Sequence, residues 1–168
     1  IEPSQNTSLC YPVYWTREGF TDPTRDWFHK YVATEVTEQD PTGGGPAVVT
    51  AYEYLDGGAW RLDDNELVKE KHRTYGQWRG FARVKTRKGS GTDPKTLSEA
   101  IYYRGMHNDR LPNNARRTAN VTLSSAVTVP GAAVSVPDHD ELAGSLRQSI
   151  TYDGDGGPVE TTTVNDHW

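Results

Sequence analysis

The chain has one cysteine, one methionine and few hydrophobic residues for its length. Of its 168 residues, 34% are hydrophobic, and the mean hydropathy is −0.78. No apolar run reaches the roughly 20 residues that a membrane-spanning helix needs, so we expect no membrane span. Cys10 has no second cysteine with which to form an internal disulfide. We therefore expect a buried, small hydrophobic residue there, or one half of a bridge to a segment outside the chain.

The chain is rich in turn-forming and aromatic residues, whereas its aliphatic residues are few. The chain holds sixteen glycines, ten prolines, nine tyrosines and five tryptophans. This aromatic content argues against disorder, and the length suits one domain. The first residue is Ile1 and the last is Trp168, an aromatic residue of a type that is usually buried. We interpret residues 1–168 as a single β-rich segment excised from a larger protein, with an irregular lead-in over 1–31 and an array of hairpins over 32–168.

The fold class follows from the hydrophobic periodicity, which is mostly two. Alternating runs cover residues 30–37, 48–55, 77–87 and 147–164, and such alternation is typical of half-buried strands. No helical segment is long enough to cross over between parallel strands, so the pairing is expected to be antiparallel. The prediction is an antiparallel all-β fold with at most two short helices; only the family resemblance described below implies that its hairpins form a curved sheet.

The two expected helices and the main turns can be placed on the chain. Asp26 is predicted to cap one helical turn, and Asp138 to cap a short helix over 142–148 that Gly144 weakens. The glycine-rich loop at 41–46 is predicted to join two strands of a hairpin. A turn is expected at 56–58. Two further alternating runs, 120–129 and 132–136, are divided by Pro130 and Gly131, and a hairpin is predicted over 149–164.

Charge is distributed unevenly along a chain whose net charge is −5. Nine of the 18 lysines and arginines lie between Arg61 and Lys88, whereas residues from Asp138 onward include seven acids and one base. We expect these opposite charges to face each other across the sheet. In the basic segment, the bases are predicted to form the outer face of the sheet and the aromatic residues its inner face. The structural-core candidates are Tyr52, Tyr54, Trp60, Trp78, Phe81, Tyr102 and Tyr152.

None of the polar motifs predicts a metal, phosphate or cofactor site. The loop at 41–46 lacks the Lys-Ser/Thr pair and the following helix of a phosphate-binding loop. Residues 153–157 offer two aspartates, whereas calcium needs six to eight oxygen ligands, so a turn is the better interpretation. Neighbouring side chains in 138–141 point apart on a strand or a helix, which favours a solvated loop or a helix cap.

The sequence predicts no catalytic residue and no enzyme activity. It has no nucleophile-elbow motif, and nothing supports Cys10 and His29 as a nucleophile–base pair. Segment 69–88 interleaves basic and aromatic residues, a pattern of single-stranded nucleic-acid binding. The same spacing fits a strand with aromatic residues inward, which we prefer, so no nucleic-acid partner is predicted. Exposed aromatic rings that serve as sugar platforms remain an alternative.

Several ordered segments resemble the Rhs/YD-repeat proteins of actinobacteria, and the resemblance covers roughly residues 8–168. Tyr152-Asp153 followed by Gly156-Gly157 matches the short YD signature, and 52–54 and 102–105 resemble degenerate copies. Long segments separate the three copies, unlike a regular repeat array. The segments that carry the resemblance are DWFHKYVATEVTEQDPTGGGPAVVTAYEYLDGGAWRLDDNEL, RTYGQWRGFARVKTR, YYRGMHNDRL and ITYDGDGGPVETTTVNDHW.

The resemblance implies an architectural function in a secreted or cell-surface protein. Rhs proteins and the related toxin-complex proteins wind a long antiparallel sheet into a hollow shell, often around a C-terminal toxin, and teneurins use the same shell in adhesion. Self-cleavage in that family belongs to a separate aspartate-protease core, which has no match here. The implied partners are the remainder of the parent chain and an encapsulated C-terminal toxin. The alternative functions are a β-sandwich module that binds a glycan or a protein through exposed aromatic residues, and a hydrolase fragment.

Overall fold

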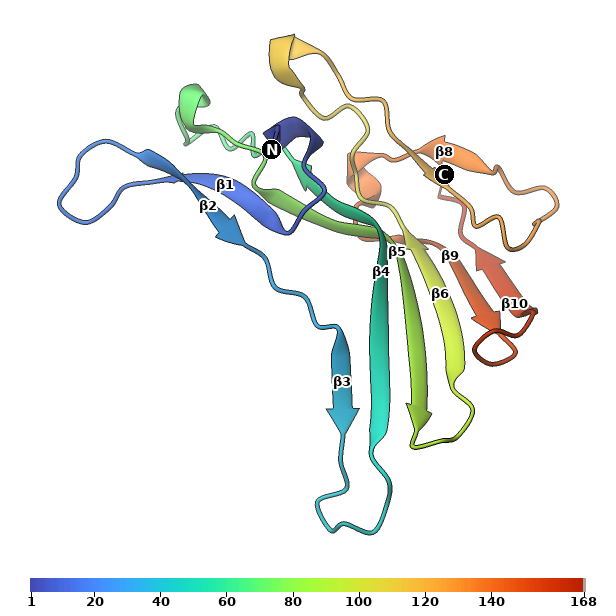
Figure 1. Ribbon diagram of the computed structural model, residues 1–168. Helices are drawn as coiled ribbons and strands as arrows, with labels where there is room; N and C mark the ends of the chain where they lie inside the picture. Colours follow the sequence, from blue (N-terminus) through green and yellow to red (C-terminus); the bar gives the residue numbers. More distant parts are fainter. Residues whose placement is uncertain (168) are drawn as a thin grey trace.

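The computed structural model describes residues 1–167, and its fold is all-β and antiparallel (Figure 1). Helical structure in these residues is confined to four three-residue 3₁₀ turns. The strands are β1 (Cys10–Trp15), β2 (Thr24–His29), β3 (Glu35–Glu38), β4 (Val48–Arg61), β5 (Gln77–Ser90), β6 (Thr96–Tyr102), β7 (Asn120–Thr122), β8 (Ser135–Pro137), β9 (Leu146–Tyr152) and β10 (Val159–Val164). The 3₁₀ turns are η1 (Pro3–Gln5), η2 (Glu70–His72), η3 (Pro112–Asn114) and η4 (Asp140–Leu142).

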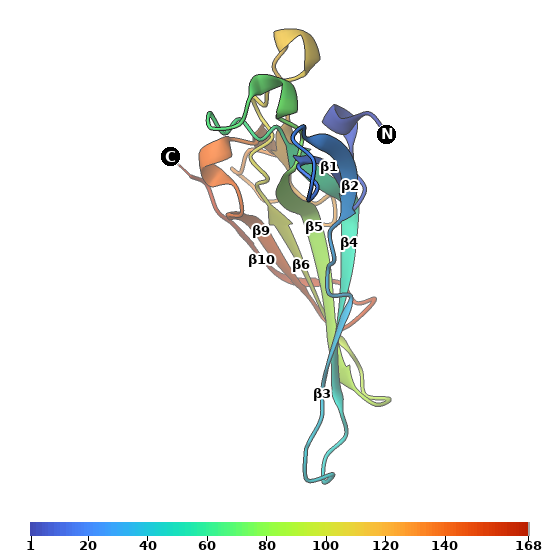
Figure 2. The same ribbon diagram turned by 90° about the vertical axis from the view of Figure 1, so that its left-hand side faces the viewer.

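Six strands form one open sheet in the order β10-β9-β6-β5-β4-β3. The sheet twists from β3 to β10, as the two perpendicular views show (Figures 1 and 2). Strands β1 and β2 form a separate hairpin beside the upper end of β4 and β5, and β7 and β8 form a second small hairpin near β6 and β9. Strands β3 and β10 are the two edges of the large sheet. The antiparallel all-β fold that the periodicity predicts is thus confirmed.

Strand β4 is longer than the sequence predicts. The prediction of a turn at 56–58 is wrong, and the strand continues through these residues. Asp56 and Gly57 have positive φ angles of 66° and 72°, yet the chain continues in the same direction along β5. The pairing register shifts between Leu55 and Gly58, so these residues form a β-bulge, not a reversal. The true connection between β4 and β5 is the charged segment 62–76.

Two expected hairpins are confirmed, and the alternating runs within 120–136 contribute to a third. The loop at 39–47 joins β3 to β4, with Glu38 opposite Val48. Strands β9 and β10 pair across the turn at 153–158, where Gly154 and Gly156 have φ angles of 73° and 89°. Strands β7 and β8 pair over three residues each, on either side of Pro130-Gly131.

The lead-in over residues 1–31 is more regular than expected. Residues 24–29 form strand β2 and not a helical turn, and they pair with β1 in register from Cys10–His29 to Trp15–Thr24. The Asp26 carboxylate caps no helix: it accepts hydrogen bonds from the indole Nε1 of Trp15 at 2.6 Å and from the guanidinium of Arg17. Cross-strand pairing with β1 therefore outweighs the local helical signal.

The helix expected after Asp138 is also absent. A single 3₁₀ turn covers Asp140–Leu142, and Gly144 with φ of 83° redirects the chain into β9. The Asp138 carboxylate accepts hydrogen bonds from distant backbone amides instead of capping its own segment. Residues 146–148 complete the sheet between β6 and β10, a position that no local signal specifies.

The buried apolar residues form two small clusters. One consists of Trp60, Leu62 and Tyr75, against which Tyr11 and Trp78 pack. The other joins β6 to the β7–β8 hairpin and is made of Ile101, Tyr103 and Val121, with Val136 and Leu142 packed against it. Both lie toward the upper part of the sheet in Figure 1, where the small hairpins cover it.

Candidate functional site on the two faces of the open sheet

Strand register separates aromatic from charged side chains on β4 and β5. Tyr54 lies opposite Val84, and Glu53 lies opposite Lys85. Because successive side chains of a strand point to opposite faces, Tyr52 and Tyr54 share one face, whereas Arg83, Lys85 and Arg87 share the other. The predicted separation of aromatic from basic residues across the sheet is therefore present.

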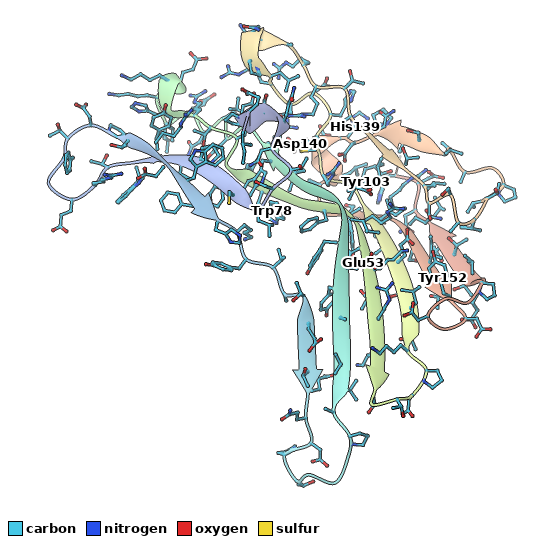
Figure 3. All side chains as sticks on the ribbon, viewed as in Figure 1. Glu53, Trp78, Tyr103, His139, Asp140 and Tyr152 are labelled. Carbon is cyan, nitrogen blue, oxygen red and sulfur yellow. The ribbon has the colours of Figure 1, made fainter. Side chains whose placement is uncertain are left out.

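On one face, eight aromatic rings form a continuous series that we call the aromatic row. Adjacent ring centroids lie 4.5–6.5 Å apart, which is within the range of favourable aromatic contacts. The row runs along β4 and β5 and continues onto β1 and β2; Figure 3 shows its member Trp78 toward the β1–β2 hairpin. Its members in order are Tyr52, Tyr54, Phe81, Trp78, Trp60, Tyr11, Phe28 and Trp15.

The β-bulges place rings from both strands in this row. Gly58 allows the closest approach, because a Cβ atom there would lie 2.6 Å from two ring carbons of Trp78. Beyond the bulge, Trp60 pairs with Trp78, and Tyr11 stacks on Trp60 with centroids 4.5 Å apart. The indole Nε1 of Trp60 also donates a hydrogen bond to the Ser8 carbonyl at 2.8 Å. The row therefore attaches the β1–β2 hairpin to the large sheet.

Among the seven core candidates, Trp60 alone is fully buried, with 2% of its surface exposed. Tyr52, Tyr54, Trp78, Phe81, Tyr102 and Tyr152 are half-buried. Beside Tyr102, the neighbouring Tyr103 is buried in the second cluster. Tyr103 lies two residues after Ile101 and packs in the same cluster, so the alternation of β6 continues through it and directs Tyr102 to the opposite face.

The other face carries a network of alternating charges that we call the charged lattice. Glu99 on β6 is 3% exposed and lies between Arg83 and Lys85, with N–O distances of 3.8 and 3.9 Å. Arg87 pairs with Glu53 at 2.7 Å and with Asp155 at 3.1 Å. The three bases are about 30% exposed, and each of them pairs with at least one carboxylate.

The ion pairs and hydrogen bonds of the charged lattice shift the pKa values of its members. The hydrogen bond from Arg87 lowers the pKa of the Glu53 carboxyl and raises the pKa of the Arg87 guanidinium. Tyr152 on β9 donates a hydrogen bond from its hydroxyl to Glu99 Oε2 at 2.9 Å. Burial, together with this bond to a carboxylate, raises the pKa of Tyr152 to about 12. Figure 3 shows Glu53 and Tyr152 on different parts of the sheet, on β4 and β9.

The expected contact between the basic and acidic segments is confirmed at two places. Arg87 reaches Asp155 in the β9–β10 turn. Asp140 in η4 pairs with Arg61 at 3.3 Å and with Arg79 at 2.7 Å. These ion pairs join the β4–β5 hairpin to segments more than sixty residues further along the chain.

Three buried charged residues form contacts between distant segments that the sequence did not predict; it named only Asp138, as a helix cap. Asp138 binds the backbone amides of residues 104–106. Asp109 accepts hydrogen bonds from the Leu62 amide and from Arg117. Arg147, 1% exposed, donates to the carbonyls of Ala133 and Asn165 and pairs with Asp166. Sequence offers no signal for them, because their partners are mostly backbone groups far along the chain.

The catalytic and metal candidates that were weighed and set aside occupy structural positions. Cys10 and His29 face each other across β1 and β2, but within residues 1–167 no hydrogen bond joins their side chains. The side chains of Asp138 and Asp140 diverge, one to backbone amides and one to arginines. The described part of the chain contains no cluster of three or more His, Cys, Asp or Glu side chains placed to hold a metal ion.

The loop at 41–46 is organised by Asp40. Its carboxylate accepts hydrogen bonds from the amides of Thr42, Gly44 and Gly45 at 2.8–3.1 Å, and bonding to Thr42 is the main cause of the lowered pKa of Asp40. A β-strand follows this loop, as expected for a hairpin.

Residues 1–167 include no helix with the length and apolar character needed to cross a bilayer. We also compared the chain with protein-family models, curated proteins and solved structures, and none of these comparisons found a match.

Proposed function

We propose that this chain is a structural, non-enzymatic segment of a large Rhs/YD-repeat protein and forms part of a β-sheet shell or scaffold. The observation that carries the proposal is the open six-stranded sheet, whose edges β3 and β10 have no partner strand among residues 1–167. In a shell, neighbouring hairpins of the parent chain pair with such edges. The proposed setting is a secreted or cell-surface protein whose shell encloses a C-terminal toxin.

Backbone geometry identifies the free groups at each edge. The Tyr52 amide donates to the Thr34 carbonyl, and in an antiparallel ladder hydrogen-bonded pairs alternate with non-bonded ones. Glu35 and Thr37 of β3 therefore direct their backbone groups away from β4. By the same argument, from the bond between the Asn165 amide and the Arg147 carbonyl, Thr162 and Val164 of β10 direct theirs away from β9.

Exposed aromatic residues support the same proposal. Phe20, Trp15, Trp27, Phe28 and Tyr31 are 41–84% exposed, and all belong to the β1–β2 hairpin and its flanks. Trp15 and Phe28 lie on one face of the hairpin and Trp27 on the other, and exposed apolar surface is typical of interaction sites. In the proposed shell, the parent chain covers it.

Hydrogen–deuterium exchange tests the proposal. In the isolated chain, the amides of Glu35, Thr37, Thr162 and Val164 should exchange rapidly, and in the protein encoded by the complete gene they should be protected. Amides of β5, which pairs on both sides, serve as the control because they should be protected in both samples. Rapid exchange of all four edge amides in the complete protein would refute the shell segment.

The alternative, recognition of a glycan or a protein through aromatic residues, draws its support from Trp27, which is 42% exposed. The aromatic row itself is a poor sugar platform, because Tyr54 stacks on Phe81 and Tyr11 stacks on Trp60 at 4.5 Å, so neighbouring rings cover these faces. Glycan binding by the isolated chain that Trp27→Ala abolishes would favour the alternative over the shell.

A further inference from the structure

A groove of about 420 Å³ lies between the β7 segment and the large sheet. Residues 120–125 form one wall, Ala82, Arg83 and Ile101 contribute to the floor, and Arg104 lies at the lining together with Asp138. Its volume is in the range of sites that hold an organic ligand. The groove is therefore large enough for a few residues of an extended chain.

The wall of this groove is a strand edge with free backbone groups. The Leu123 amide donates to the Val134 carbonyl at 2.8 Å, and the Asp138 amide donates to the Ala119 carbonyl at 3.0 Å. In an antiparallel ladder, hydrogen-bonded pairs alternate with non-bonded pairs. The backbone groups of Val121 therefore bond to β8, whereas those of Asn120 and Thr122 point away from β8. Within residues 1–167, the backbone groups of Asn120 and Thr122 form no hydrogen bond with a backbone segment outside this ladder.

Arg104 supplies a cation that lacks a carboxylate partner in the part of the chain described. The Asp138 carboxylate is occupied by three backbone amides, and the Asp56 carboxylate pairs with Arg83 at 3.2 Å. Burial lowers the pKa of the Arg104 guanidinium, and the charges of Asp138 and Asp56 oppose this effect. A desolvated guanidinium with unused donors is stabilised by a carboxylate, which accepts two parallel hydrogen bonds.

We propose that this groove binds an extended acidic peptide segment, which adds as a strand to the free edge of β7 and places a carboxylate on Arg104. Backbone pairing supplies affinity, as in other cases of strand addition, and the pocket selects the side chain. Ile101 in the floor favours an apolar neighbour on the same face of the peptide. This binding site is additional to the edges β3 and β10.

Titration of the isotope-labelled chain with the peptide acetyl-Thr-Val-Asp-Val-Thr-amide, followed by amide NMR, tests the proposal. The Asn120 and Thr122 signals should shift, and the same peptide with Asn in place of Asp should bind about tenfold more weakly or worse, because a charge-assisted hydrogen bond is lost. Arg104→Gln should reduce binding of the Asp peptide by a similar factor, and Arg104→Lys by less. The matched control Arg110→Gln, at an ion pair with the exposed Glu70, should leave affinity unchanged.

Two further measurements separate strand addition from simple anion binding. Two N-methylated versions of the peptide are compared, one methylated at the second and fourth amides and the other at the first and third. Only one of the two should lose binding, because a strand presents alternate amides to its neighbour. Sodium acetate should not reproduce the shifts at Asn120 and Thr122. Equal affinity for the Asp and Asn peptides, no effect of Arg104→Gln, or identical binding by both N-methylated peptides would each overturn the proposal.

Discussion

Replacement of Asp138 by alanine should destabilise the fold strongly, because its carboxylate organises the turn after β6. The side chain is 2% exposed and accepts hydrogen bonds from the amides of Arg104, Gly105 and Met106 at 2.7, 2.8 and 3.2 Å. A buried donor left without a partner costs about 1–3 kcal/mol. Three such donors with partial relaxation give a loss of about 3–6 kcal/mol, a large share of the roughly 5–15 kcal/mol of a typical domain.

Urea unfolding followed by tryptophan fluorescence measures this loss as a change in the midpoint at constant slope. Asp138→Asn should lose less, about 1–3 kcal/mol, because one oxygen still accepts from two amides while the new NH₂ group opposes the third. Asp22→Asn is the matched control: this aspartate is exposed, so a change below about 1 kcal/mol is expected. An Asp138→Ala variant within 1 kcal/mol of the parent chain, or one equal to Asp138→Asn, would refute the reasoning.

Three further predictions concern the aromatic row and the charged lattice. Trp60→Ala should reduce the free energy of unfolding by about 3–5 kcal/mol, since a buried aromatic side chain is removed. Trp27→Ala, at an exposed ring, should change it by less than about 1 kcal/mol. Chemical denaturation of both variants measures the two changes. Gly58→Ala places a Cβ 2.6 Å from the Trp78 ring, so an overpacking loss of about 1–3 kcal/mol is expected in the same assay, and a stability equal to that of the parent chain would argue against the bulge contact. The raised pKa of Tyr152, about 12, holds the phenol neutral in the folded state while the unfolded chain ionises near its ordinary value of about 10; stability should therefore fall between pH 10 and 12 by roughly 2–3 kcal/mol, and Tyr152→Phe should remove that part of the slope in unfolding curves measured across this range.

Periodicity was a reliable guide where neighbouring strands are also neighbours in sequence. The β3–β4 and β9–β10 hairpins follow from alternation and from the glycines between the strands. Alternation also separates Tyr54 from Lys85 across the sheet, since that property belongs to any strand. These features depend on a few consecutive residues, so the local sequence contains the information.

Local signals misled where a tertiary contact competes with them. Asp56 and Gly57 have the chemistry of a turn, yet pairing with β5 extends through them and makes a bulge. Asp26 and Asp138 have the chemistry of helix caps, yet each finds stronger partners elsewhere, Trp15 in one case and distant amides in the other.

The candidate site, too, has features that the local sequence predicts and features that depend on tertiary contacts. The sequence identified most members of the aromatic row and the opposition of basic and acidic segments, because both are properties of composition and alternation. It did not indicate that Glu99 is buried among bases, nor that Arg104, which has no carboxylate partner within residues 1–167, lies beside the free edge of β7.

By itself, the sequence determined an all-β antiparallel chain with aromatic and charged side chains on opposite faces, because alternation with period two is typical of strands and the chain lacks the long helices that join parallel strands. Tertiary structure alone decided that the large sheet stays open, with β3 and β10 at its edges, and that buried charged groups such as Asp138 and Arg147 hold its upper part together. The physical reason is that strand order and the partners of a buried charge are set by contacts between residues far apart in the chain.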